Sequence, residues 1–291
     1  MDIIIDNIVN DWGKYKSFIQ ENHLHLLTKE DHFGIGISTL SDAIAYTVVR
    51  VSPEHSQATI IALLVEQRYR GIGIERILLT TVERKLKEKN YRFLTYDCVV
   101  QEGEKPEREF LQQSEGWGEG RALSTVFIAS IYECMNAKWM GVVKIPKHFQ
   151  IFTWDTLTET EKIYIQEGKD SWYPAKLSPW HEEHLVDRHL SIGVRYKGEV
   201  VGWSLVQRAA KNMVLFKSLF VRDQYSKLGR GALVLAESIK VVATVNEIEF
   251  GMFVVENENK EMLDLTKRHL LPYVIRKKHL VSFRKSISYN T

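Results

Sequence analysis

The stretch at residues 58–89, ATIIALLVEQRYRGIGIERILLTTVERKLKEK, decides the fold of this chain. Residues 58–65 are an apolar, β-branched run that is typical of a buried strand. From Ile74 onward, apolar residues recur every three or four positions beside charged ones, which predicts an amphipathic helix. Residues 66–73 between them are polar and carry two glycines. The stretch therefore predicts a strand, a glycine loop and a helix, in that order.

The flanking segments extend this pattern into an α/β arrangement. Residues 43–51 (AIAYTVVRV) and residues 93–100 (FLTYDCVV) have the composition of strands. A polar loop, a helix opening near Pro106 and a strand at residues 122–131 are expected to follow. The first half of the chain is therefore predicted to form a mixed sheet with helices packed against it.

The same order of signals returns in the second half of the chain. The predicted elements there are strands at 192–196, 200–207 and 214–221, a helix at 232–241, a strand at 248–255, a helix at 259–268 and a strand at 273–283. An internal duplication is the simplest account of this repetition. We predict two α/β domains with mixed sheets, residues 1–145 and 146–291, which pack together because no Gly/Ser-rich or Pro-rich linker separates them.

Composition excludes several classes of function. Lys and Arg together number 39 against 37 for Asp and Glu, so the net charge of +2 gives no general attraction for nucleic acid or an anionic membrane. The two cysteines have no nearby partner at a metal or redox spacing, which fits a reducing compartment. No apolar run approaches the roughly 20 residues of a membrane span. We expect a cytoplasmic protein without nucleic-acid or membrane partners.

The glycine loop before the helix at Ile74 is the most informative candidate site. A helix N-terminus offers free backbone N–H groups and a partial positive charge, so glycines there let a pyrophosphate approach closely. A dinucleotide-binding fingerprint requires a third glycine where Arg76 stands, and the Gly-Lys-Ser/Thr of a P-loop is missing. Both of these nucleotide-binding motifs are therefore excluded.

The remaining pattern, Arg68-x-x-Gly71-x-Gly73, resembles the pyrophosphate loop of GNAT acyltransferases, which reads Arg or Gln, two residues, Gly, one residue, Gly or Ala. The order of surrounding elements is similar to that superfamily, down to the Gly116-Trp117 step after the predicted fourth helix. The resemblance implies acetyl-CoA as cosubstrate. The residues it implies as the acetyl-CoA contacts of the first half are Val65, Arg68, Tyr69, Arg70, Gly71, Ile72, Gly73 and Ile74.

Residues 221–232 resemble the same loop, with Ser226 where Arg or Gln is expected. Its implied acetyl-CoA contacts are Val221, Ser226, Gly229, Arg230 and Gly231, together with Asn259, which resembles the family residue that contacts the pantetheine arm. We expect Gly71 to superpose on Gly229 and Gly73 on Gly231. Because Arg68 can make a charge-assisted phosphate contact, we also expect the first loop to hold CoA more tightly.

The resemblance also implies where the acyl group reacts. In the family a backbone N–H near a bulge at the end of the fourth strand stabilises the oxyanion, which would fall at about Val65 or Val221. The family tyrosine that protonates the departing sulfur is replaced by Gln112 in the first half and by Thr266 in the second. Tyr96 is a weak catalytic candidate, as is Tyr225. An acceptor amine must also lose a proton to a carboxylate, a histidine or water.

A metal site is not expected. The run His181-Glu182-Glu183-His184 has one residue too few between its histidines for the zinc motif H-E-x-x-H. The aromatic cluster of Trp172, Tyr173 and Trp180 falls where the family walls its acceptor pocket, although ordinary core packing explains these residues equally well.

These observations predict an acyl-CoA-dependent N-acyltransferase that moves an acetyl group from acetyl-CoA to an amine of a small molecule or peptide by direct transfer. Two alternatives stay open. One is a non-catalytic CoA-binding or interaction module, because both family tyrosines are replaced. The other is an aminoacyl transferase with tandem GNAT-like domains, which would not need a pyrophosphate loop. The chain is equally compatible with a monomer and a homodimer.

Overall fold

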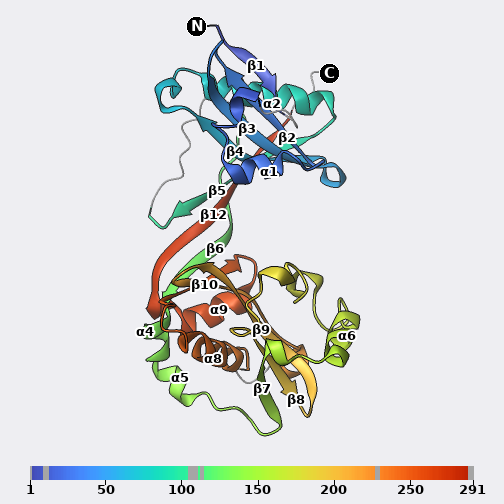
Figure 1. Cartoon of the computed structure of the whole chain (residues 1–291), viewed down its shortest axis with the longest axis vertical. Helices are drawn as coiled ribbons and strands as arrows, with labels where there is room; N and C mark the ends of the chain where they lie inside the picture. The colour runs from blue at the N-terminus through green and yellow to red at the C-terminus, as the bar shows by residue number, and fades with distance from the viewer. Residues whose placement is uncertain (1, 9–12, 104–110, 112–114, 227–229, 288–291) are drawn as a thin grey trace. The chain divides into compact units, whose positions relative to one another are not determined.

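The computed structural model describes every residue except 1, 9–12, 104–110, 112–114, 227–229 and 288–291 (Figure 1). The chain divides into two compact units. Unit 1 comprises Met1–Leu123 together with His279–Thr291, and unit 2 comprises Ser124–Lys278. Each unit is a sheet with helices packed on it, so the predicted α/β class is confirmed.

The sheet of unit 1 has the order β1 (Ile4–Asn7), β2 (His32–Ser38), β3 (Ala43–Ser52), β4 (Gln57–Val65), β5 (Phe93–Gln101) and the end of β12 (Val274–Ser286). The first four strands are antiparallel, and β4 and β5 are parallel. The parallel pair requires a crossover, which is provided by α2 (Ile74–Glu88). A short helix, α1 (Glu21–Leu26), precedes β2.

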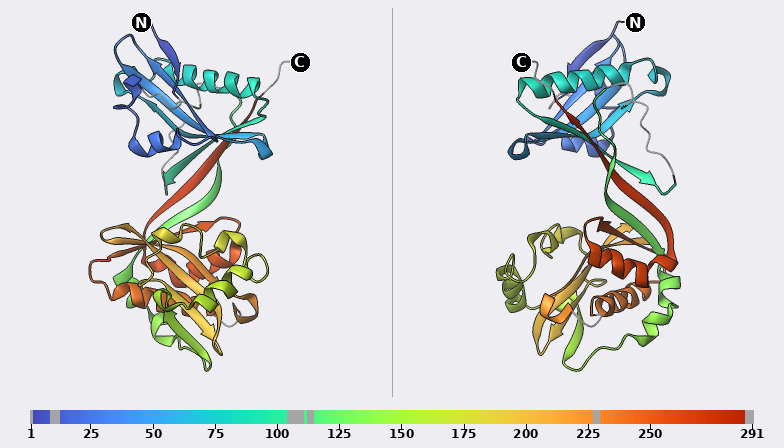
Figure 2. Two further views of the ribbon diagram at one scale, coloured as in Figure 1. Left: turned by 45° about the vertical axis from the view of Figure 1, so that its right-hand side comes forward. Right: turned by 180° about the vertical axis from the view of Figure 1, so that it is seen from behind.

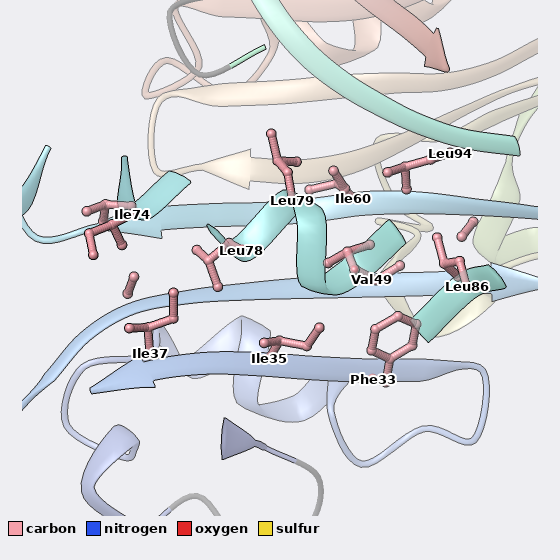
Figure 3. Packing of buried hydrophobic residues seen from close by; sticks show 14 of the residues in the cluster. Phe33, Ile35, Ile37, Val49, Ile60, Ile74, Leu78, Leu79, Leu86 and Leu94 are labelled. Carbon is pink, nitrogen blue, oxygen red and sulfur yellow. The ribbon is translucent and has the colours of Figure 1, made fainter. Parts of the chain in front are cut away.

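Helix α2 covers one face of this sheet because its apolar residues fall on one side (Figure 3). Leu78, Leu79, Val82 and Leu86 have no exposed surface. They pack on side chains of β2, β3, β4 and β5, among them Phe33, Ile35, Val49, Ile60 and Leu94. This packing places the N-terminus of α2 beside the end of β4.

The sheet of unit 2 has the order β6 (Arg121–Ser130), β11 (Phe250–Glu256), β10 (Met213–Val221), β9 (Glu199–Ala210), β8 (Ile192–Tyr196) and β7 (Phe149–Thr153). Helices α8 (Arg230–Ala243) and α9 (Lys260–His269) lie on one face, and α6 (Glu159–Glu167) lies on the other (Figure 2). The remaining helices are short: α4 (Ile131–Met135), α5 (Lys138–Val142) and α7 (Asp223–Ser226).

Five strands of unit 2 repeat the topology of unit 1. Strands β7 to β10 are antiparallel to one another, and β10 and β11 are parallel with α8 between them. Two landmarks in unit 2 lie 156 residues after their counterparts in unit 1: the parallel pairing begins at Gln57 and Met213, and β4 and β10 end at Val65 and Val221. The two units are therefore internal repeats of one fold.

The sixth strand of each unit is contributed by the other half of the sequence. β6, which follows β5 in the chain, pairs with β11 in unit 2, whereas β12 lies beside β5 in unit 1. Phe283 at the end of β12 is buried in unit 1, where its ring stacks on Tyr96, and Lys285 forms an ion pair with Glu83. Because of this exchange, the units differ from the predicted domains 1–145 and 146–291 at residues 124–145 and 279–291.

Candidate functional site

The parallel strands of unit 2 part at a bulge. β10 and β11 are in register from Met213, opposite Phe250, to Phe216, opposite Phe253. On the other side of β10, Phe216 pairs with Val206 and Ser218 with Leu205, so Lys217 is an extra residue in β10. A bulge interrupts the ladder locally, and here it lies where the two parallel strands separate.

Unit 1 has the same arrangement at Ile61. There the parallel pairing of β4 with β5 ends at Ile60, opposite Tyr96, and Ile61 is the extra residue in the pairing of β4 with β3. The expected bulge thus exists in both units, but it lies four residues before Val65 and Val221 rather than at them. In each unit the bulge comes directly after the last parallel pair, and not at the last residue of the strand. Val65 itself is buried in the core of unit 1.

A cavity of about 130 Å³ in unit 2 occupies the space where β10 and β11 part. The bulge lines it through Phe216, Lys217 and Ser218. Other lining residues come from β11, α8 and α9 and include Gly251, Phe253, Leu235, Ile239, Asn259, Met262 and Leu270. The cavity is mainly apolar with a few polar groups, a composition typical of small-molecule sites.

Lys217 and Glu182 form an ion pair at the bulge. Lys217 Nζ donates to Glu182 Oε2 and to the His181 backbone carbonyl, both at 2.6 Å. The Lys217 side chain is mostly buried, whereas that of Glu182 is about half exposed. Lys217 holds the pKa of the Glu182 carboxyl below its usual value, so this carboxylate stays charged at neutral pH. The sequence marks Lys217 only as a charge that interrupts an apolar strand, and we did not predict a role for it.

Helix α9 carries two polar side chains on one face, and the first of them lines the cavity. Asn259, at its N-cap, lines the cavity and accepts a hydrogen bond from the Met262 N–H through Oδ1. Thr266 lies on the same face of α9, at the position implied for the family tyrosine, and is 1% exposed. Its Oγ1 is buried and has no hydrogen-bond partner among the described residues.

Cys134 also lines the cavity but is not suited to be a nucleophile. It is 2% exposed, and burial together with the nearby Glu133 raises the pKa of its thiol to about 12. A buried, protonated thiol behaves as a small apolar side chain.

Helix α8 (described from Arg230) lines the cavity through Leu235 and Ile239. Gly231 is its second residue, and a Cβ built there would lie 3.4 Å from Leu265 Cδ1 of α9, an ordinary contact. Gly229 lies outside the described residues, as do the side chains of Ser226 and Arg230. Their predicted cofactor contacts stay predictions. Val221 ends β10 and packs against Val234 of α8.

The unit 1 loop places its basic residues outside the helix N-terminus. The side chain of Arg68 is 77% exposed and forms an ion pair with Glu66 at 2.6 Å. Arg70 Nε donates to the Val65 carbonyl at 3.0 Å, and Tyr69 packs against the core. The expected phosphate contact of Arg68 stays a prediction.

The glycines of this loop have left-handed backbone conformations. Gly71 has φ +73° and Gly73, the N-cap of α2, has φ +96°, where a Cβ would be strained. Ile72 between them is exposed, and Ile74 is buried under the helix. The loop thus turns sharply into α2, as the sequence predicts.

The two loops align in a different register from the one expected. The strands before the two loops align with an offset of 156 residues, at Gln57 and Met213 and at the bulge residues Ile61 and Lys217. The same offset along the sequence pairs Gly73 with Gly229 and Glu75 with Gly231. In that register the family pattern reads Arg70-x-x-Gly73-x-Glu75 in unit 1. The expected superposition of Gly73 on Gly231 differs from this alignment by two residues, whereas the superposition of Gly71 on Gly229 stays a prediction because Gly229 lies outside the described residues. A pair of glycines does not by itself show where a helix begins.

The other candidate residues pack in the cores of the units or lie outside the description, and Tyr96 is opposite Ile60, next to the unit 1 bulge. Tyr96 stacks on Phe283 in unit 1, and Tyr225 packs on the rings of Phe149 and Tyr196 in unit 2. Gln112 is outside the described residues. Trp172 and Tyr173 surround Trp203 in the core of unit 2 and also border an open hollow of about 570 Å³ with Asp170, Arg222 and Asp223.

Within the residues described by the structure, no group of three or more His, Cys, Asp or Glu side chains is placed to hold a metal ion. None of the helices formed by those residues is both long and apolar enough to span a bilayer.

Comparisons with known proteins agree with this architecture. Residues 3–117 match the model of the acetyltransferase (GNAT) family. The whole chain is similar to a tandem GNAT protein from the clavulanic acid biosynthesis pathway, with 11% identity, complete coverage of both chains and a TM-score of 0.69.

Two further solved structures have related folds. A GNAT-family acetyltransferase from Colwellia psychrerythraea matches 97% of this chain and 99% of its own at 10% identity, with a TM-score of 0.60. A glucosamine N-acetyltransferase region of a fungal β-N-acetylglucosaminidase matches 97% of this chain and 38% of its own at 13% identity, with a TM-score of 0.66. No match was found among curated protein sequences. Residues 3–117 are therefore a GNAT acetyltransferase domain, and the whole chain has the fold of a tandem GNAT protein.

Proposed function

We propose that this protein is an acyl-CoA-dependent N-acyltransferase that moves an acetyl group from acetyl-CoA to an amine of a small molecule or peptide, and that the reaction takes place in unit 2. The observation that carries the proposal is the cavity between β10 and β11, which is lined by the bulge residue Lys217 and by Asn259. This reverses the preference for the first half that Arg68 suggested from the sequence.

The residues around the cavity fit an acyl-CoA. The N-terminus of α8 would face the pyrophosphate, with Gly231 leaving room for its approach. Asn259 Oδ1 is used by the helix cap, so the amide NH₂ is the group that would donate to a carbonyl of the pantetheine arm. Thr266 lies one turn along α9 from the cavity-lining Met262, and its buried Oγ1 has no hydrogen-bond partner within the described part of the chain, so it could donate to a sulfur atom. When bound, acyl-CoA supplies an activated thioester carbonyl.

The bulge provides the electrostatic element of the reaction. A bulged residue leaves the regular ladder, so its backbone N–H can point at an oxyanion, as a fixed donor does in acyl-transfer enzymes. We assign this role to the backbone at Lys217 and Ser218 rather than at Val221. Removal of one such donor in other enzymes costs about 3–4 kcal/mol of transition-state stabilisation.

Glu182 contacts the bulge through its ion pair with Lys217. A charged carboxylate there attracts an acceptor ammonium and can receive its proton through water. Because Lys217 lowers its pKa, Glu182 is a weak base, and its main contribution is to orient the amine.

Turnover of acetyl-CoA tests this proposal. Release of free thiol by the full chain is measured across a panel of amines, with Gly231→Glu as the site variant and Gly141→Glu as the control. A Cβ at Gly141 in α5 meets no atom within 4 Å, so the control adds the same charge without a clash. We expect Gly231→Glu to lose turnover and Gly141→Glu to keep it. CoA binding without turnover of any amine would instead identify a non-catalytic CoA-binding module, and equal activity of both variants would exclude unit 2 as the site.

A further inference from the structure

The carboxylate of Glu75 lies inside the glycine loop of unit 1. Glu75 is the second residue of α2 and is only 8% exposed. Its Oε1 accepts a hydrogen bond from the Gly71 backbone N–H at 3.4 Å. Its Oε2 is buried and has no hydrogen-bond partner among the described residues. A buried charged residue at an otherwise apolar position of a helix requires an explanation.

The position of Glu75 in the repeat provides an explanation for its burial. Counted along the chain from the bulge residues Ile61 and Lys217, Glu75 corresponds to Gly231 of unit 2. The acyltransferase loop has glycine or alanine at this position, because a small residue lets a phosphate reach the backbone N–H groups. In unit 1 this space holds a side chain that is itself an anion.

We propose that Glu75 is a built-in substitute for the pyrophosphate in unit 1, so that this loop is closed to CoA and the chain binds one CoA molecule, in unit 2. The second half of this statement rests on the proposed function; the first half concerns unit 1 alone. A carboxylate in the first turn of a helix is stabilised by the free N–H groups and the macrodipole, which are the same features that bind a phosphate.

Two effects exclude a pyrophosphate from this loop. The carboxylate occupies the N–H of Gly71, and its negative charge repels a second anion at short range. Of the basic residues of the loop, Arg68 is paired with Glu66, and Arg70 donates through Nε to the Val65 carbonyl. By contrast, Gly231 at the corresponding position of unit 2 has no side chain.

Reciprocal substitutions at the two equivalent positions test the proposal in the full chain. Isothermal titration calorimetry with CoA gives the number of sites for the wild type, Gly231→Glu, Glu75→Gly and the double variant. Arg76→Gly is the control, because it places a glycine one residue further along the same turn of α2 and leaves the carboxylate in place. Thermal unfolding by circular dichroism checks that each variant is folded.

We expect one CoA site in the wild type and in Arg76→Gly, none in Gly231→Glu, two in Glu75→Gly and one in the double variant. Inorganic pyrophosphate is a second probe that needs only the loop: its ³¹P resonance should broaden with the double variant and not with Gly231→Glu alone.

The titrations distinguish a failure of the inference about Glu75 from a failure of the assignment of the CoA site to unit 2. If Glu75→Gly adds neither a CoA site nor pyrophosphate binding, the inference about Glu75 is overturned, whatever unit 2 does. If the wild type binds no CoA but Glu75→Gly binds one, the inference stands and the assignment of the site to unit 2 fails. Two sites in the wild type would overturn the inference directly.

Discussion

Asn259 and Arg68 separate the two possible locations of the cofactor site at the level of single residues. Asn259 lines the cavity of unit 2, whereas Arg68 is exposed and paired with Glu66. We expect Asn259→Asp to lower kcat/KM for acetyl-CoA by about fivefold, because the carboxylate keeps the helix cap but loses the amide donor, a contact of about 1 kcal/mol. Arg68→Ala should change kcat/KM less than twofold.

Steady-state kinetics with any amine that is turned over decide between these residues. The Asp substitution is chosen so that unfolding of α9 does not imitate a loss of cofactor binding. A larger effect of Arg68→Ala than of Asn259→Asp would return the site to unit 1.

Substitution of Thr266 should change stability and activity in different ways. Its hydroxyl is buried without a partner among the described residues, so Thr266→Val removes a desolvated polar group and keeps the shape. We expect the free energy of unfolding to stay the same or rise by about 1 kcal/mol. If the hydroxyl donates to the departing sulfur, kcat should fall severalfold while KM is unchanged. Urea unfolding and kinetics on the same preparation measure both effects, and an unchanged kcat would leave Thr266 a packing residue only.

At the level of the elements, the N-terminus of α6 is stabilised by a carboxylate, and this stabilisation is lost when the carboxylate is protonated. Glu161 completes a capping box with Thr158 and forms two hydrogen bonds to Arg195, at 2.5 and 3.0 Å. Arg195 lowers the pKa of Glu161 from 4.5 to about 2. Since the folded pKa lies below the unfolded one, this stabilisation is complete above pH 4.5 and is lost as the pH falls toward 2.

Glu161→Gln should therefore destabilise unit 2 by about 2 kcal/mol at pH 7, with a difference from the wild type that shrinks below pH 4.5. Urea unfolding followed by tryptophan fluorescence measures it, because Trp154, Trp172 and Trp203 form part of the core of unit 2. The control is Glu159→Gln on the same helix, whose side chain is 83% exposed and which should stay within about 0.5 kcal/mol of the wild type. A difference that does not depend on pH would contradict this account.

Most elements near the site could be predicted from local pattern. The strand expected at 192–196 has those bounds, and the helix expected from Ile74 to Lys89 ends one residue earlier. β2 was missed because its sequence HFGIGIS contains two glycines and a histidine, which local propensity does not assign to a strand. Those glycines are required by packing: a Cβ at Gly36 would lie 2.4 Å from the ring of Tyr15. Tertiary contact, not propensity, determines this strand.

The chemistry of the site was less predictable than its supporting elements. The glycine loops were recognisable, but their register depends on where each helix begins, and this depends on the burial of Ile74 and its neighbours. The bulges at Ile61 and Lys217 are not visible in the sequence, because they reflect pairing with a second strand. The sequence alone does not distinguish Glu75 from an exposed helix residue, because its burial depends on how α2 packs.

For the whole molecule, the exchange of the last strands makes unit 1 depend on the end of the chain. Removal of residues 279–291 would delete Phe283 and Ile287 from its core, together with the ion pair between Lys285 and Glu83. We expect this truncation to leave unit 2 folded and unit 1 largely unprotected. Hydrogen exchange should show the loss in peptides from residues 32–65 and not in peptides from residues 192–221.

A rearranged chain provides the matching control. Trp117 pairs antiparallel with Lys285, so residues 123 and 279 would face each other if this register continued. A protein of residues 1–123 joined by Asn-Gly to residues 279–291 should then close a hairpin and fold as unit 1 alone. Residues 1–145, the first half as predicted from sequence, should not fold. The opposite result would mean that β12 contributes little to unit 1.

The same exchange has a consequence for biosynthesis. At about 5–20 residues per second, His279 leaves the ribosome roughly 8–30 s after Leu123. During that interval the first unit to be translated lacks its last strand, while Ser124–Lys278 is a continuous segment that can fold as soon as it emerges. The order of maturation should therefore be the reverse of the order of translation, and the nascent N-terminal unit, with the β5 edge exposed, is the stage of synthesis most in need of a chaperone.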